Sequence, residues 1–149
     1  MMLKKPFKIF VYFVSVICLI SIAFACAGPA ATSLPEPSYA KAITENVLNG
    51  INSGDYIQFS KDFDVSMKQA MTQQSFEQIK STLANKIGSY VPNSLEFSQA
   101  VTQSKYTVVI YSAKFTNETD KVIITISFQN IGGQDLVGGL YFNSPKLRS

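Results

Sequence analysis

The stretch from Lys105 to Phe142 constrains the fold more than any other part of this chain. It contains three runs rich in β-branched and aromatic residues, 105–115, 121–128 and 136–142, joined by two short polar turns. Apolar runs of strand length separated by turn residues are typical of antiparallel strands that pair with their neighbours in sequence. The stretch therefore predicts an antiparallel meander.

Alternation along the last two runs separates an apolar face from a polar one. The apolar residues expected to share a face are Val122, Ile124, Ile126 and Phe128, followed by Leu136, Leu140 and Phe142. The run 105–115 is apolar on both sides, so either two layers cover it or a bulge exchanges its faces. We expect the bulge, because a single helical layer covers only one face of a sheet. Gly138 and Gly139 predict a bend or bulge in the last run, because they remove side chains from a strand.

Apolar residues recur at helical spacing in the segment that precedes the sheet. They predict four helical segments: 38–52, a short one capped by Asp55, another capped by Asp64, and 73–87. Thr72 is the expected cap of the last helix, and Gly88 is its expected end. A further strand is expected over 94–102. Helices followed by a long sheet predict the α+β class, with N-terminal helices packed on a four-stranded antiparallel sheet.

The first part of the chain predicts a targeting segment. Lys4, Lys5 and Lys8 precede an uncharged apolar run over 9–27 that ends in small residues. A basic start, an apolar stretch and a cleavage site of small residues are typical of a secretory signal peptide. The chain is therefore divided into a signal peptide over 1–25, a flexible, proline-bearing tether over 26–37 and a single domain over 38–149.

Three kinds of N-terminus are consistent with this segment. Ala23-Phe24-Ala25-Cys26 resembles the lipobox of prokaryotic lipoproteins, in which the cysteine is acylated and becomes the mature N-terminus. Cleavage without lipid gives a secreted protein. The apolar run is also about as long as a minimal membrane span of ~17–20 residues, so an uncleaved anchor stays open. We expect an exported domain in the cell envelope, at the outer face of the membrane or extracellular, with Cys26 as the candidate lipidation site.

Composition excludes several classes of function. The net charge of +3 comes from the three lysines of the targeting segment, since the remaining 10 basic and 10 acidic residues balance. A neutral domain lacks the basic surface that nucleic-acid binding needs. The chain has no histidine, and both cysteines lie in the export segment, which removes Ser-His-Asp and Cys-His catalysis and imidazole metal sites. We expect no metal, no cofactor and no nucleic-acid partner.

Several motifs of the domain are similar to those of one protein family. They are Asn49-Gly-Ile-Asn-Ser-Gly-Asp-Tyr56 with Phe63-Asp64 and Met67, Ile87-Gly88-Ser-Tyr90, the strand from Tyr106 to Phe115, and Val137-Gly-Gly-Leu-Tyr-Phe142 with Pro145. Together they resemble a domain-of-unknown-function family of secreted prokaryotic proteins and lipoproteins with a nuclear-transport-factor-2-like, or cystatin-like, fold. The resemblance covers about 39–145. It implies a curved sheet wrapped around a long helix, forming a cone with a cavity at its wide end, and it implies no established activity.

Aromatic residues supply the candidate binding residues. Most phenylalanines of the domain lie at core spacing, and a cone places Phe59, Phe63, Tyr90 and Tyr106 at its mouth as candidate pocket-lining residues. The expected function is a non-enzymatic, membrane-tethered domain that binds an apolar small ligand, a peptide or a partner protein.

Carboxylates supply an alternative function. Asp62-Phe63-Asp64 contains a close acid pair, and its simplest interpretation is a surface carboxylate followed by a helix cap. No residue is assigned a catalytic role. A lyase- or isomerase-like enzyme stays open, in which Asp64 or Asp55 acts as a base beside Tyr56, Tyr90 or Tyr106. A homodimeric structural module that pairs two sheets through their exposed faces also stays open.

Overall fold

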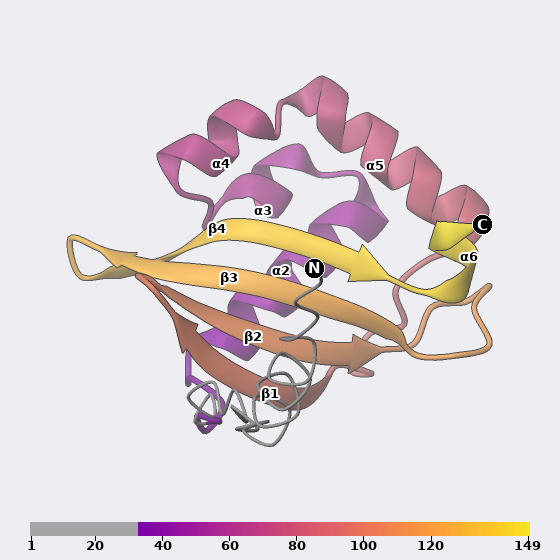
Figure 1. Ribbon diagram of the computed structural model, residues 1–149. Coiled ribbons are helices and arrows are strands. Elements are labelled where there is room, and N and C mark those ends of the chain that lie inside the picture. Colours follow the sequence, from indigo (N-terminus) through magenta and orange to yellow (C-terminus); the bar gives the residue numbers. More distant parts are fainter. Residues whose placement is uncertain (1–32) are drawn as a thin grey trace, which may run out of the picture. The chain divides into compact units, whose positions relative to one another are not determined.

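The computed structural model describes residues 33–149 (Figure 1). The predicted signal peptide, Cys26 and most of the predicted tether lie outside the described residues. The elements in order are α2 (Ala40–Ser53), α3 (Tyr56–Ser60), α4 (Val65–Ala70), α5 (Gln73–Lys86), β1 (Glu96–Gln103), β2 (Tyr106–Ala113), β3 (Val122–Ile131), β4 (Gln134–Asn143) and α6 (Pro145–Arg148). Within 33–149, no helix has the length and apolar character needed to cross a membrane.

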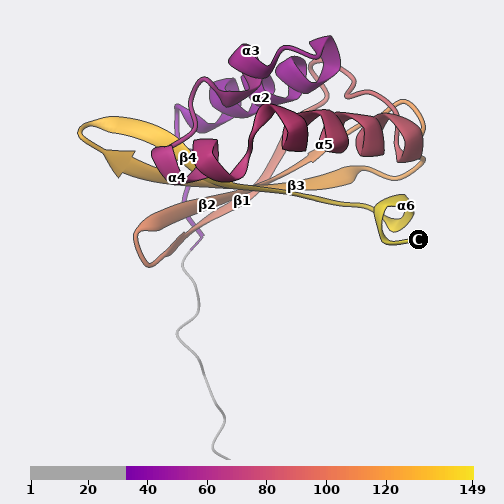
Figure 2. The same ribbon diagram turned by 90° about the horizontal axis from the view of Figure 1, so that it is seen from above.

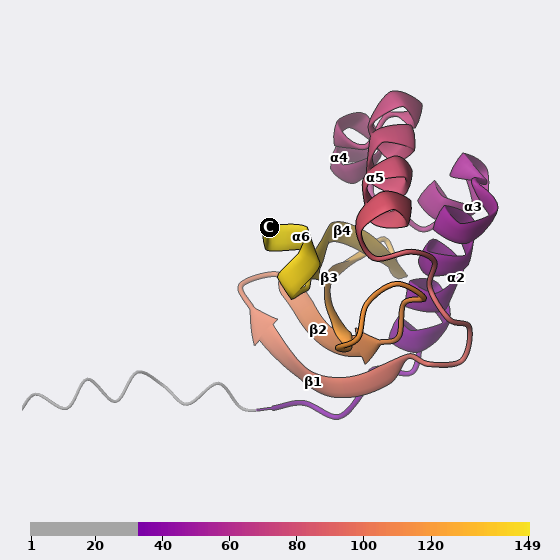
Figure 3. The ribbon, with the colours of Figure 1, turned by 90° about the vertical axis from the view of Figure 1, so that its right-hand side faces the viewer.

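The four strands form one antiparallel sheet in the order β1-β2-β3-β4. The sheet is curved but not closed into a barrel, and helices α2 to α5 lie on one side of it (Figures 2 and 3). The α+β class predicted from the sequence is therefore confirmed. The hydrophobic residues that are buried in the described chain form one core, and 33–149 lie in one compact unit. We therefore expect residues 33–149 to fold as a fragment.

The helix caps follow from the sequence. The side chain of Asp55 accepts hydrogen bonds from the N–H groups of Ile57 and Gln58, and that of Thr72 accepts one from Ser75. Each side chain satisfies donors that a helix N-terminus leaves without a partner. Gly88 ends α5 with a φ of 80°, in the left-handed region that glycine adopts without strain. The predicted starts and stop of these helices are confirmed.

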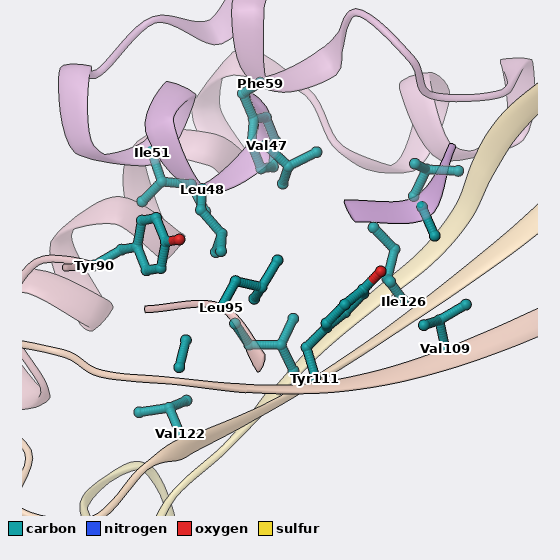
Figure 4. Close-up of a cluster of buried hydrophobic side chains, with 14 of the residues drawn as sticks. Val47, Leu48, Ile51, Phe59, Tyr90, Leu95, Val109, Tyr111, Val122 and Ile126 are labelled. Carbon is teal, nitrogen blue, oxygen red and sulfur yellow. The ribbon is translucent and has the colours of Figure 1, made fainter. Parts of the chain in front are cut away.

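The core lies between α2 and the helix-facing side of the sheet (Figure 4). On β3, the four residues predicted to share the apolar face are each at most 1% exposed. On α2, Val47, Leu48 and Ile51 form the opposing stripe, and Tyr111 of β2 lies between the layers. At roughly 25 cal/mol per Å² of apolar surface removed from water, such burial is the main stabilising contribution available to a domain without a disulfide.

Two predictions about strand faces are wrong. The bulge expected in β2 is absent, because its pairing with β3 runs without a shift; the irregularity lies in the neighbouring strand, between Phe97 and Gln99. Leu136 does not share a face with Leu140. It pairs with Gln129, whereas Val137 pairs with Phe128 and is fully buried. The cause is a bulge at Gly138, which inserts one residue and exchanges the faces of β4 there. The irregularity expected from the two glycines is therefore confirmed.

The last residues of the predicted tether contact the outer edge of β1. The N–H of Leu34 donates to the carbonyl of Ala100 at 2.7 Å. The buried hydroxyl of Tyr111 donates to the carboxylate of Glu36 at 2.9 Å. Burial, together with this carboxylate, raises the pKa of Tyr111 above its usual value. The chain therefore enters the domain along this edge strand.

Candidate functional site

An apolar groove runs between α5, the second half of β4 and α6. Its volume is about 340 Å³, close to the lower end of the range of small-molecule sites. The residues that line it are Met71, Gln78, Ile79, Thr82, Leu83, Leu140, Tyr141, Phe142 and Leu147. Six of these nine side chains are aliphatic or phenylalanine, so the groove offers an apolar surface within reach of solvent.

Local sequence explains how each wall is placed. Ile79 and Leu83 recur four residues apart on α5, so both lie on one side of that helix. Beyond the bulge at Gly138, Leu140 and Phe142 alternate toward the helices on β4. The side chain of Ser144 caps α6 by accepting a hydrogen bond from Leu147, and Pro145 occupies its first turn. This start places Leu147 at one end of the groove.

The rims of the groove are polar or aromatic. Gln78 and Thr82 lie four residues apart on α5 and edge the groove on one side. Lys86 lies one turn further along α5, beyond the lining, where its ammonium donates to the main-chain oxygen of Ser149. On the strand side the rim is Tyr141, which is 60% exposed. Among the described residues, no carboxylate or thiol lines the groove. The arrangement is therefore suited to binding an apolar group.

The four pocket residues predicted from the sequence lie elsewhere. Phe59, Phe63 and Tyr90 are at most 3% exposed and belong to the packed core. The rings of Phe59 and Phe63 meet edge to face, with 4.9 Å between their centroids. The ring of Tyr90 packs on that of Phe115, with 6.0 Å between their centroids. The hydroxyl of Tyr90 is buried and has no hydrogen-bond partner among the described residues. Tyr106 is half-buried, and none of the four lines the groove.

Asp64 is the buried carboxylate of the domain, at 3% exposure. One oxygen, Oδ1, accepts a hydrogen bond from the N–H of Met67 at 2.6 Å and caps α4. The other, Oδ2, accepts one from the side-chain amide of Gln129 on β3, also at 2.6 Å. A Cβ added at Gly138 would lie 3.0 Å from this Oδ2 and 2.9 Å from Cε1 of Tyr106. Glycine is therefore what allows the carboxylate and the ring to approach the strand.

The structure thus places Asp64 and Tyr106 close together at Gly138, but the carboxylate of Asp64 is occupied by hydrogen bonds that stabilise the fold. Both oxygens have donors within the protein, and the lining of the groove does not include Asp64. Asp55 is an exposed cap, and the main-chain carbonyl of Asp62 accepts a hydrogen bond from Val137. In residues 33–149 no three potential metal ligands are grouped together.

The comparisons with known proteins give a family without an assigned activity. Residues 44–131, more than half of the chain, match the family described as "Protein of unknown function (DUF3887)". The chain belongs to this family, which confirms the predicted domain-of-unknown-function class. No curated protein matches the chain. Among solved structures, that of Bdellovibrio bacteriovorus Bd1075 is similar at 15% identity with a TM-score of 0.43, over 70% of this chain and 40% of that one.

Proposed function

We propose that this protein is an exported, membrane-tethered, non-enzymatic domain that binds an apolar small ligand in the groove between α5, β4 and α6. The observation that carries the proposal is the groove itself: an apolar surface of ligand size that the fold leaves uncovered. The same groove also suits an apolar side chain of a peptide or partner protein. Among the described residues its lining contains no carboxylate to act as a base, which supports binding over the Asp- and Tyr-based enzyme.

The export and anchoring parts of the proposal rest on the N-terminal sequence. The basic start, the apolar run and Cys26 after small residues support a lipoprotein held at the outer face of the membrane. Secretion without lipid and an uncleaved anchor are the alternatives. A nuclear-transport-factor-2-like or cystatin-like fold completes this proposal, supported by the helices on one face of a curved sheet. Mass spectrometry of the mature N-terminus distinguishes lipid on Cys26, a free N-terminus and an intact leader.

Ligand binding is tested with a matched pair of tryptophan variants in residues 33–149. Thr82→Trp fills the groove from its rim, whereas Ser81→Trp places the same ring on the neighbouring exposed position, which does not line the groove. We expect the neutral fluorophore N-phenyl-1-naphthylamine to bind the parent protein and Ser81→Trp saturably, and to lose this binding in Thr82→Trp. Equal binding by both variants would contradict the proposal.

A second function, as a homodimeric module, is favoured by the face of the sheet that points away from the helices. Val108 and Ile110 of β2 lie on this face and alternate with the buried Val109 and Tyr111. They pair with Val101, Gln99, Ser127 and Thr125 of the neighbouring strands, none of which is charged. Cores of protein interfaces are depleted of charge in the same way. Light scattering on 33–149 tests the dimer: Val108→Lys should dissociate it, and a parent monomer at high concentration excludes it.

A further inference from the structure

Two cations lie beside the end of the groove at α6. Arg148 follows Leu147, the residue that lines this end, and Lys86 reaches α6 from the last turn of α5. The ammonium of Lys86 donates to the main-chain oxygen of Ser149, and the guanidinium of Arg148 donates to Oδ1 of Asn143 at 3.0 Å. Within 33–149, neither cation forms a salt bridge with an acidic side chain. The third cation of α6, Lys146, does not add to them, because its ammonium contacts the carbonyl of Asn117 and its N–H donates to the carboxylate of Glu118 at 3.4 Å.

The other end of the groove is uncharged. It is formed by Met71, the residue that ends α4, with Ile79 on α5 opposite Leu140 on β4. If each atom takes about the 30 Å³ of a water molecule, the volume of 340 Å³ holds on the order of ten non-hydrogen atoms. This is the size of one medium alkyl chain, and the groove therefore has an apolar body with a single basic end.

We infer that the groove takes a single-chain amphiphile with an anionic head group, its chain along Leu83, Leu140 and Phe142 and its head beside Lys86 and Arg148. The inference rests on the proposed function and adds the charge of the ligand to it. Charge complementarity selects this occupant: an anion gains charge-assisted hydrogen bonds at this end, a neutral head gains ordinary ones, and a cationic head is repelled. Gln78 and Thr82 on the rim offer polar contacts only to the part of the ligand that faces water.

The test compares three probes with the same ten-carbon chain: decanoate and decyltrimethylammonium below their micelle concentrations, and decan-1-ol below its solubility limit. Binding to residues 33–149 is measured by calorimetry and located by amide chemical shifts. The variant Lys86→Gln/Arg148→Gln removes the two cations beside the α6 end of the groove. The control Lys41→Gln/Lys105→Gln removes two cations that lie on α2 and in the turn between β1 and β2, and it changes the net charge equally.

We expect decanoate to bind about tenfold more tightly than decan-1-ol at low salt, and decyltrimethylammonium to bind most weakly. The Lys86/Arg148 variant should bind decanoate about as weakly as it binds decan-1-ol, with the decan-1-ol affinity unchanged, and the control should keep the difference. Equal affinity for decanoate and decan-1-ol in the parent protein overturns the inference and leaves the proposed function standing. Binding of none of the three probes overturns both.

Discussion

The two halves of β4 meet the helical layer in different ways. In the first half, Val137 pairs with the segment between α3 and α4: its N–H donates to Asp62 at 2.8 Å and its carbonyl accepts from Asp64 at 2.9 Å. In the second half, no backbone hydrogen bond joins 140–142 to α4 or α5 within the described chain, and the groove opens between the strand and α5. We call the first half of β4, around Val137, the sealed half, and the second half, 140–142, the open half.

The difference shows what closes the edge of this sheet. An edge strand presents backbone donors and acceptors that only another extended segment satisfies in register. The segment 62–64 supplies that pairing through the bridge between Phe63 and Val137, and Asp64 and Phe63 then fill the space behind it. A helix such as α5 packs through side chains alone, so a site for a ligand persists wherever those side chains do not meet the strand. The comparison predicts large energetic effects in the sealed half and small ones at the groove.

Truncating a phenylalanine in each half should give the largest contrast. Phe63→Ala, in the sealed half, removes a ring that is 1% exposed and leaves a cavity, so we expect a loss of ~3–5 kcal/mol in the free energy of unfolding. Phe142→Ala, in the open half, removes a half-buried ring and should cost about half as much. Urea denaturation of both variants measures the difference. Equal losses would mean that the second half is as tightly packed as the first.

Removing the buried carboxylate should have the next largest effect. Asp64→Ala deletes the cap of α4 and leaves the side-chain amide of Gln129 without its acceptor, which together predict a loss of ~2–3 kcal/mol. Asp55→Ala is the matched control, because it deletes an exposed cap with no partner on the sheet and should cost only ~1 kcal/mol. Thermal unfolding of the two variants shows which of them loses more stability. A smaller loss for Asp64→Ala than for Asp55→Ala would show that Asp64 does not hold the sealed half together.

The two neighbouring glycines of β4 should differ on substitution. A Cβ at Gly138 meets Asp64 and Tyr106 at 3.0 Å or less, so Gly138→Ala should cost ~1–2 kcal/mol as the side chains shift. A Cβ at Gly139 lies 3.6 Å from the nearest atoms, those of Ser127, which is an ordinary contact. Gly139→Ala should therefore change stability by less than ~0.5 kcal/mol. Chemical denaturation of both variants measures this; comparable losses would argue against the close approach at the bulge.

The smallest effect expected is a loss of stability at alkaline pH that is caused by the ionisation of Tyr111. Tyr111 pairs with Ile124 across the sheet, and Ile124 pairs with Phe142 of the open half. The pKa of Tyr111 is raised in the folded protein, so its contribution is complete below the unfolded pKa of about 10 and is lost as the pH rises above it. We expect unfolding free energy to decline above pH 10, with a shallower decline in Tyr111→Phe. An identical pH dependence in that variant would mean that the folded protein does not raise the pKa of Tyr111.

The sequence predicted the order and type of the elements because the signals for them are local. Asp55, Asp64, Thr72 and Gly88 set helix ends through contacts within a few residues. The faces of β4 were partly missed, because a bulge at Gly138 depends on which residues of β3 lie opposite. Two glycines in a strand indicate an irregularity but not which residue is the extra one.

The groove was not predicted because its walls come from segments far apart in the chain. Ile79 and Leu83 were visible as a helical stripe, and Leu140 and Phe142 as a strand face, but their separation depends on how α5 packs. The signal that was available is Ser144-Pro145, a cap residue followed by proline at a helix start, which indicates the short α6 that closes the groove. Phe59, Phe63 and Tyr90 were expected at a cavity mouth, but aromatic residues at core spacing pack equally well inside.

The most direct test of the open half is an NMR titration of residues 33–149 with decan-1-ol, a neutral probe that depends on the groove alone. We expect saturable amide shifts confined to 71, 78–83, 140–142 and 147, with 62–64 and 136–138 unchanged. Shifts centred on 62–64 and 136–138, or no saturable shifts at all, would contradict it.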